Sequence, residues 1–151
     1  MTEKSCGTIP YTVADGVIRY LLIKSKRGGV CGFPKGHVED GESELDTALR
    51  ETQEETSLLP TVDGEFRYEI SYKMSNGNDK AVVYFLGRVE DMSPRRNGSF
   101  EDFDYLVLPY EEAYRRLSFE NARQMLRAAN SFLTARAERV SPTLNRDASG
   151  E

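Results

Sequence analysis

Alternation of apolar and polar residues predicts several short β-strands along the chain. Residues 8–13 and 17–23 are rich in β-branched, aliphatic and aromatic side chains, and Asp15-Gly16 between them is typical of a hairpin turn. Gly28-Gly29 marks another turn. Further strands are predicted at residues 30–33, 66–73, 81–89 and 105–108. Because residues 81–89 are almost continuously apolar, we expect that strand to lie in the centre of a sheet.

Apolar residues spaced three and four apart predict helices between and after these strands. Ser43 is a suitable N-cap for a helix that continues to about Glu55 and is followed by turn residues at Pro60 and Asp63-Gly64. Its expected core-facing stripe is Leu45, Ala48, Leu49 and Thr52. A short helix is predicted at 111–117, and Ser118 is expected to cap a last helix. The stripe of that helix is Ala122, Met125, Leu126, Ala129, Phe132 and Leu133.

A length of 151 residues suits one domain. Strands precede and follow one early helix and a helix closes the pattern, which predicts an α/β fold of the mixed, α+β kind rather than regular βαβ alternation. We expect the domain to occupy residues 1–135. Residues 136–151, which are polar and contain a proline and a glycine, are predicted to form a frayed C-terminal tail.

Composition narrows the class of protein. Hydrophobic residues make up 38% and charged residues 30%, and no apolar run approaches the roughly 20 residues that a membrane span requires. The N-terminus shows no secretory signal. Cys6 and Cys31 lack metal-type spacing, so we expect free thiols in a reducing cytoplasm. The net charge of −5 argues against a stable nucleic-acid partner, and the oligomeric state is left open.

Acidic residues concentrate in one segment. Residues 36–65 hold ten acidic side chains and a single basic one, Arg50. Glu51, Glu54 and Glu55 are spaced so that they share one patch of the first helix, where like charges repel. One interpretation is a solvated helix face. The other is a site for a hard divalent cation, which prefers carboxylate oxygens and would offset the repulsion.

The same residues form a specific motif. Gly36, then Glu42 after five residues, then Arg50-Glu51-Thr52-Gln53-Glu54-Glu55-Thr56-Ser57-Leu58 after seven more resembles the box of the Nudix hydrolase family. Two positions depart from the family's pattern: Thr52 replaces an aliphatic residue and Ser57 replaces a glycine. Neither departure removes a carboxylate.

This resemblance implies a mixed sheet sandwiched between helices, with the box as a loop-helix-loop, and a metal-dependent pyrophosphohydrolase. It implies that Glu51, Glu54 and Glu55 hold Mg²⁺ or Mn²⁺, helped by a backbone carbonyl near Lys35 or Gly36. It assigns Arg50 and Glu42 to orienting the helix. Glu51 or a loop glutamate such as Glu101 would act as the base.

A narrower resemblance extends over about residues 6–133. Residues 33–39, 48–55, 82–86 and 101–113 are similar to the asymmetrical diadenosine tetraphosphate hydrolases. It implies a nucleotide substrate, with Lys35 and His37 near the phosphates and Tyr84 and Tyr105 clamping adenine. The alternatives are a solvated Lys35, a His37 that bonds backbone, a solvated Glu101 and tyrosines that pack in the core.

The function expected from these residues is cleavage of diadenosine tetraphosphate to ATP and AMP by water. Within the same enzyme class, the alternatives are another nucleoside diphosphate linked to a further group, a capped or triphosphorylated RNA end, or a diphosphoinositol polyphosphate. From a different class, the chain could be a catalytically silent nucleotide sensor, which the intact Glu51, Glu54 and Glu55 disfavour.

Overall fold

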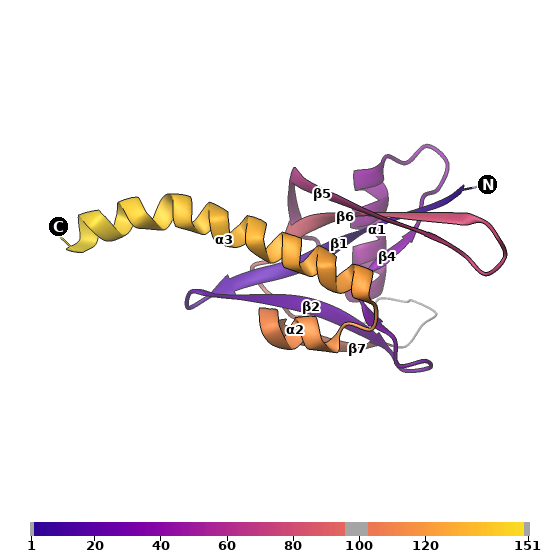
Figure 1. Cartoon of the computed structure of the whole chain (residues 1–151), viewed down its shortest axis with the longest axis horizontal. Coiled ribbons are helices and arrows are strands. Elements are labelled where there is room, and N and C mark those ends of the chain that lie inside the picture. The colour runs from indigo at the N-terminus through magenta and orange to yellow at the C-terminus, as the bar shows by residue number, and fades with distance from the viewer. Residues whose placement is uncertain (1, 96–102, 150–151) are drawn as a thin grey trace.

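The protein is built on one seven-stranded mixed sheet (Figure 1). The computed structural model describes residues 2–95 and 103–149. The strands are β1 (Thr2–Ala14), β2 (Val17–Ser25), β3 (Cys31–Gly32), β4 (Lys35–His37), β5 (Thr61–Lys73), β6 (Asp79–Arg88) and β7 (Phe103–Pro109). Five of them follow the order β3-β2-β1-β6-β5, while β4 pairs with β1 and β7 pairs with β2. Only β1 and β6 run parallel among these pairs.

Three helices cover the two faces of the sheet: α1 (Glu44–Thr56), α2 (Tyr110–Arg116) and α3 (Glu120–Ser149). Alternate residues of β6 show the division, because Val82 and Tyr84 join the apolar cluster that contains residues of α2 and α3. Val83 and Phe85, which point to the opposite face, pack with Ala48 of α1. The prediction of a mixed sheet between helices is confirmed.

Most predicted strands are present but longer than the sequence pattern indicated. The hairpin between β1 and β2 turns at Asp15 and Gly16, which both have positive φ, at 53° and 76°. As predicted, β6 is central, lying between β1 and β5. Asp63-Gly64 was expected to end a unit but lies inside β5, beside an irregularity in the β5–β6 register. A bulge there lets the strand continue past turn residues.

The capping of α1 agrees with the sequence. The Ser43 side chain accepts a hydrogen bond from the backbone of Asp46, whose carboxylate accepts one from the backbone of Ser43 in return. The helix ends at Ser57, which has a left-handed φ of 66°. A glycine adopts that conformation more readily, so Ser57 costs roughly 1 kcal/mol.

The buried face of α1 agrees in part with the predicted apolar stripe, because Ala48 and Thr52 are fully buried but Leu45 is not. Leu45 is 39% exposed, whereas the fully buried positions are Thr47, Ala48, Thr52 and Thr56. The hydroxyls of the three threonines all form hydrogen bonds inside the protein, and Thr52 shares a 2.7 Å hydrogen bond with Thr8 of β1. Hydrogen-bonded threonines can therefore occupy positions that would otherwise favour aliphatic residues.

The last helix differs from prediction at both ends. Ser118 does not cap it, because the Ser118 hydroxyl accepts a hydrogen bond from the backbone of Cys31 at 2.8 Å and α3 starts only at Glu120. The backbone of α3 is helical to Ser149, past Ala135 and through most of the segment predicted to be frayed. The domain boundary at residues 135 and 136 stays a prediction.

Two further findings bear on the composition. Cys6 and Cys31 are free and buried. Within residues 2–95 and 103–149, none of the helices combines the length and the apolar character needed to span a membrane.

Glu44, at the start of α1, ties this helix to β1 and β5. Its carboxylate accepts hydrogen bonds from Nε and Nη2 of Arg67 at 2.9 and 2.8 Å and also faces Lys4. The Arg67 hydrogen bonds, followed by Lys4, lower the pKa of Glu44 from 4.5 to about 2. The ionised form is therefore favoured by folding, and its contribution to stability is complete above the unfolded pKa.

We expect this contribution to be lost as the pH falls from about 4.5 to about 2. The free energy of unfolding of Glu44→Gln should consequently depend less on pH in that window than that of the unchanged protein. Denaturant titrations at a series of pH values measure both curves. Parallel curves would show that the Glu44 carboxylate is as easily protonated in the folded chain as in the unfolded one.

Candidate active site

Gly36 of β4 lies directly against Glu51 of α1, and this close approach brings the two ends of the box together. Gly36 lies in the middle of strand β4 and pairs with Cys6 of β1. A Cβ atom at Gly36 would lie 2.0 Å from Cδ of Glu51. No other residue fits there without displacing the carboxylate, so the backbone of β4 approaches Glu51 as closely as the chain allows.

Arg50 connects the acidic residues of the box. Its Nε and Nη2 donate to the two carboxylate oxygens of Glu42 at 2.7 and 3.0 Å. Its Nη1 donates to Glu51 at 2.8 Å and to Glu54 at 3.1 Å, and Nη2 also donates to the carbonyl of His37 at 3.0 Å. One guanidinium therefore joins the loop before α1 to two carboxylates on the helix.

The charges of this network stabilise one another. Hydrogen bonds from Arg50, and then from the Glu39 backbone, lower the pKa of Glu42 from 4.5 to about 2. The Glu42 carboxylate in turn raises the pKa of Arg50. Both groups are thus firmly ionised, and the repulsion between Glu51 and Glu54 is offset by the guanidinium between them.

Glu55 is not part of the Arg50 network and is held instead by residues of two strands, β4 and β7. Its carboxylate oxygen Oε1 accepts a hydrogen bond from the backbone N–H of Lys35 in β4 at 3.1 Å. Its backbone carbonyl accepts a hydrogen bond from the Tyr105 hydroxyl of β7 at 2.6 Å. The last turn of α1 is therefore positioned by residues distant in the sequence.

The donor set at this end of α1 fits a hard divalent cation by its chemistry. Glu55 accepts from the Lys35 backbone, Glu51 touches Gly36, and Glu54 is joined to Glu51 through Arg50, so carboxylate oxygens, which such a cation prefers, gather here. Among the residues that the structure describes, no three acidic, thiol or imidazole side chains already converge at ligand distance. Arg50 lies between Glu51 and Glu54, so these side chains would have to turn to share one ion.

His37 belongs to a small basic cluster beside the box. Its Nε2 lies 3.2 Å from Nζ of Lys80, and Lys80 also donates to the hydroxyl of Ser5 at 2.7 Å. Lys80 is only 5% exposed. Burial, and then the charge of Lys35, lowers the pKa of Lys80. Lys80 is thus a buried partner of His37, close enough to Lys35 for the two positive charges to affect each other.

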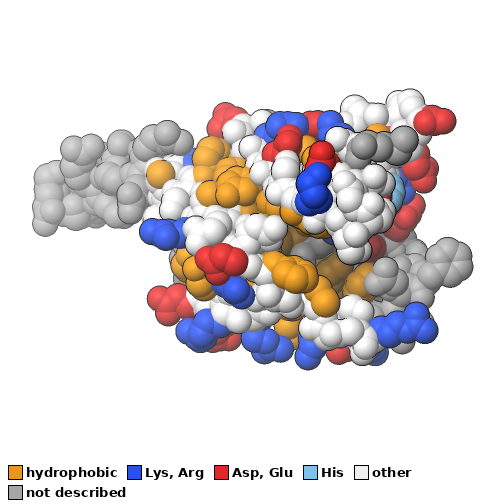
Figure 2. All heavy atoms as spheres, turned by 45° about the vertical axis from the view of Figure 1, so that its right-hand side comes forward, with side chains coloured by type: hydrophobic (Ala, Val, Ile, Leu, Met, Phe, Trp, Pro, Cys, Tyr) orange, Lys and Arg blue, Asp and Glu red, His pale blue; other side chains and the backbone are white. Residues whose placement is uncertain are grey.

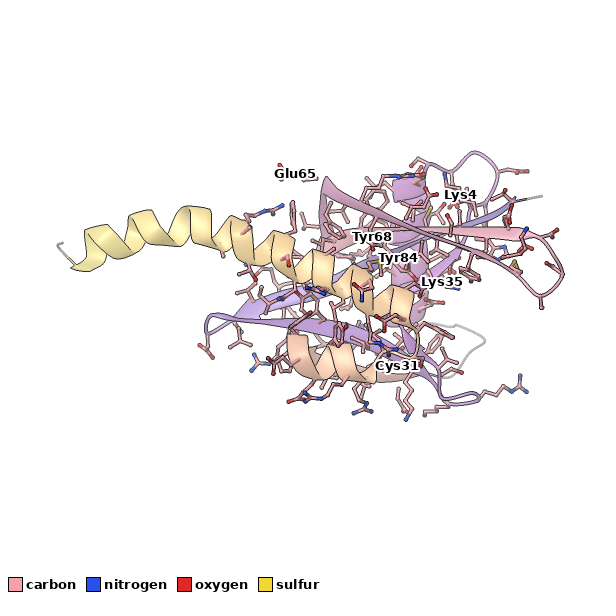
Figure 3. All side chains as sticks on the ribbon, viewed as in Figure 1. Lys4, Cys31, Lys35, Glu65, Tyr68 and Tyr84 are labelled. Carbon is pink, nitrogen blue, oxygen red and sulfur yellow. The ribbon has the colours of Figure 1, made fainter. Side chains whose placement is uncertain are left out.

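A cavity of about 650 Å³ opens next to Glu55 and Lys35. Figure 2 shows hydrophobic side chains gathered around a hollow on this face of the molecule. Tyr84 and Lys35 lie under the N-terminal part of α3, with Cys31 nearby (Figure 3). The aromatic residues that line the cavity are Phe33, Tyr72, Tyr84, Phe103 and Phe119. An apolar, aromatic hollow that ends at charged groups suits a flat ring joined to a charged chain.

The structure separates the two tyrosines expected to form a clamp. Tyr84 lines the cavity, is 6% exposed and meets Phe33 edge-to-face at 6.2 Å between ring centroids. Tyr105 packs with Leu21 and Leu58 in a different apolar cluster, and its hydroxyl is bound to Glu55. The two rings are not brought together on one cavity wall. Glu101 lies outside the described residues.

Phe119 and Lys80 are candidate site residues that the sequence analysis did not select. Phe119 lines the cavity and is 57% exposed, which is unusual for a large apolar side chain. Its place directly before the last helix was the one available signal. Lys80 was one of several scattered bases, and only the pairing of β6 with β1 brings it to His37.

Comparisons with known proteins agree with this geometry. The NUDIX domain family profile matches residues 10–129. The bis(5'-nucleosyl)-tetraphosphatase [asymmetrical] of Sus scrofa is 34% identical over 148 residues, which cover 91% of this chain and 99% of that protein. The protein of the same name from Caenorhabditis elegans is 27% identical, covering 88% of this chain and 98% of its own length.

Solved structures show the same fold. The crystal structure of a C. elegans Ap4A hydrolase binary complex superposes with a TM-score of 0.80 and 26% identity, covering 88% of this chain and 98% of that chain. The NUDIX domain of Shewanella oneidensis NrtR, solved with ADP ribose, has a TM-score of 0.70 at 16% identity and covers 88% of this chain and 89% of its own. The second likeness concerns the fold alone.

Proposed function

Because the chain belongs to the NUDIX domain family, we propose that it is a Mg²⁺- or Mn²⁺-dependent pyrophosphohydrolase that cleaves diadenosine tetraphosphate to ATP and AMP. The observation that carries this proposal is the position of the acidic end of α1. Glu55 borders both the carboxylate patch and the aromatic cavity, so a bound nucleotide would present its phosphates to the patch.

The metal is assigned to Glu51, Glu54 and Glu55 with a carbonyl of Lys35 or Gly36. When bound, a divalent cation supplies positive charge to the phosphoryl oxygens and lowers the pKa of water. Glu51, which touches the β4 backbone, is suited to hold or accept a proton from the attacking water. Arg50 orients the carboxylates of Glu51 and Glu54 by hydrogen bonds, and Glu42 fixes Arg50. Glu101 is kept as an alternative base.

The rest of the substrate is assigned to the neighbouring surfaces. Lys35, at the edge of the cavity, and His37 are assigned to the polyphosphate, whose negative charges match cationic donors. Lys80 is buried and supports His37. The adenine is assigned to the cavity, between Tyr84 on the wall and Phe119 at the opening. A cytoplasmic location, favoured by the two free cysteines, is part of the same proposal.

Replacing Phe119 by alanine is expected to raise the KM for diadenosine tetraphosphate about 5- to 150-fold with little change in kcat, because stacking contributes roughly 1–3 kcal/mol per base. Initial rates over a range of substrate concentrations measure this split. Tyr110→Ala, which removes an aromatic ring away from the cavity, is the control. If Phe119→Ala changes kcat and KM no differently from Tyr110→Ala, Phe119 lies outside the base-binding surface.

A panel of substrates tests the choice among Nudix activities. With Mg²⁺ present, hydrolysis of diadenosine tetraphosphate should exceed that of a nucleotide sugar, a triphosphorylated RNA end and a diphosphoinositol polyphosphate. The aromatic cavity favours the three substrates that carry a base over the inositol compound, which has none. Preference for the RNA end or the inositol compound would replace the proposed substrate, and no hydrolysis of any would favour a nucleotide sensor.

A further inference from the structure

We propose that Tyr105 is a positioning residue for the metal site, acting through the backbone of Glu55. This inference rests on the proposed function, which makes Glu55 a metal ligand. The Tyr105 hydroxyl donates to the Glu55 carbonyl at 2.6 Å, while Lys35 donates to the Glu55 carboxylate at 3.1 Å. The main chain of Glu55 is thereby held by a residue of β7, and its side chain by a residue of β4.

The carbonyls in the last turn of a helix lack donors within the helix, and α1 obtains donors for two of them from other parts of the chain. The Gln53 carbonyl keeps the ordinary helical bond from the Ser57 backbone at 2.8 Å, whereas the Thr56 carbonyl accepts from the Arg95 backbone at 2.9 Å. The Glu55 carbonyl accepts from the side chain of Tyr105. Of these three donors, only the Tyr105 hydroxyl can be removed by changing a side chain.

The ring of Tyr105 is well placed to aim that hydroxyl. In β7 the residue pairs with Ile23 of β2, so its backbone is fixed in the sheet. Its ring packs against a cluster of buried residues on the face of the sheet that carries α1: Leu21, Leu58 and Val89. The hydroxyl therefore points to the end of α1, and the ring does not line the aromatic cavity.

Loss of this hydroxyl should affect the cation more than the nucleotide. Groups that orient metal ligands typically contribute 10- to 100-fold to metal affinity. Without the hydrogen bond, the last turn of α1 gains freedom, and with it the carboxylates of Glu54 and Glu55. The cavity walls contributed by Tyr84 and Phe119 keep their contacts, because neither residue depends on Tyr105.

The test is Tyr105→Phe, which keeps the ring and removes one oxygen. Mn²⁺ alone is titrated into the full-length protein and followed by electron paramagnetic resonance, and kinetics are then measured with diadenosine tetraphosphate. We expect Mn²⁺ to bind about 10-fold more weakly, kcat to fall at low metal concentration, and the KM for the nucleotide at saturating metal to stay unchanged.

Tyr20→Phe is the matched control, because the buried Tyr20 hydroxyl also donates a hydrogen bond, to Oδ1 of Asn130 at 2.7 Å, but remote from α1. It should lower thermal stability and leave Mn²⁺ binding unchanged. Unaltered Mn²⁺ affinity in Tyr105→Phe would overturn the proposal, as would an equal loss in both variants. If instead Glu55→Gln binds Mn²⁺ normally, it is the metal assignment of the proposed function that fails.

Discussion

Replacing Glu55 by glutamine is expected to lower turnover with Mg²⁺ by at least about 100-fold, because losing a direct ligand should exceed the loss of an outer-shell partner. The fold should remain intact. Glutamine keeps an oxygen that can accept the hydrogen bond of the Lys35 backbone, and it removes one charge from a patch of like charges. Turnover, Mn²⁺ binding and the thermal midpoint are the three measurements.

Glu112→Gln is the control for this variant, since Glu112 is an exposed acid on α2, away from the box. It should behave as the unchanged protein in all three measurements. Glu55→Gln with full turnover and full Mn²⁺ affinity would contradict the assignment of Glu55 to the cation. A variant that loses activity only because it unfolds would show a lowered thermal midpoint instead.

Replacing Arg50 by lysine is expected to lower both turnover, about 10- to 100-fold, and stability. Lysine keeps the charge but cannot reproduce the fork through which Arg50 binds both oxygens of Glu42 while also reaching Glu51 and Glu54. Glu42 would lose part of its hydrogen bonding, and the carboxylates of the helix would lose their orientation. Kinetics at saturating Mg²⁺ and thermal unfolding measure the two effects separately.

Arg67→Lys provides the comparison, because Arg67 forms a similar two-point pair with Glu44, at the opposite end of α1 from Glu54 and Glu55. It should lower stability and leave turnover unchanged. If both arginine variants lose stability and neither loses turnover, Arg50 has a structural role only.

The box could be predicted from the sequence because its residues lie within one short segment of the chain. The cap at Ser43 and the shared patch of Glu51, Glu54 and Glu55 follow from helix geometry, and the pairing of Arg50 with Glu42 was implied by the family resemblance. The buried face of α1 was harder to predict. An exposed Leu45 beside buried threonines reflects a contact with Thr8, which is decided by the register of helix against strand.

Long-range placement explains the remaining differences. Tyr84 and Tyr105 both occupy strands, but which face each one points to depends on the pairing of β6 and β7 with the rest of the sheet. The same pairing brings Lys80 to His37. Phe119 gave no periodic signal, because it lies in the connection between two helices. Such residues are visible only after the fold is known.

The pair of products formed from diadenosine tetraphosphate tests the central claim most directly. The protein is incubated with the dinucleotide and Mg²⁺, and the nucleotides are separated by ion-exchange chromatography at early times. The proposed function predicts equal amounts of ATP and AMP, with formation abolished by chelating the metal. Two molecules of ADP for each substrate consumed, or ATP and AMP at an undiminished rate in excess chelator, would contradict it.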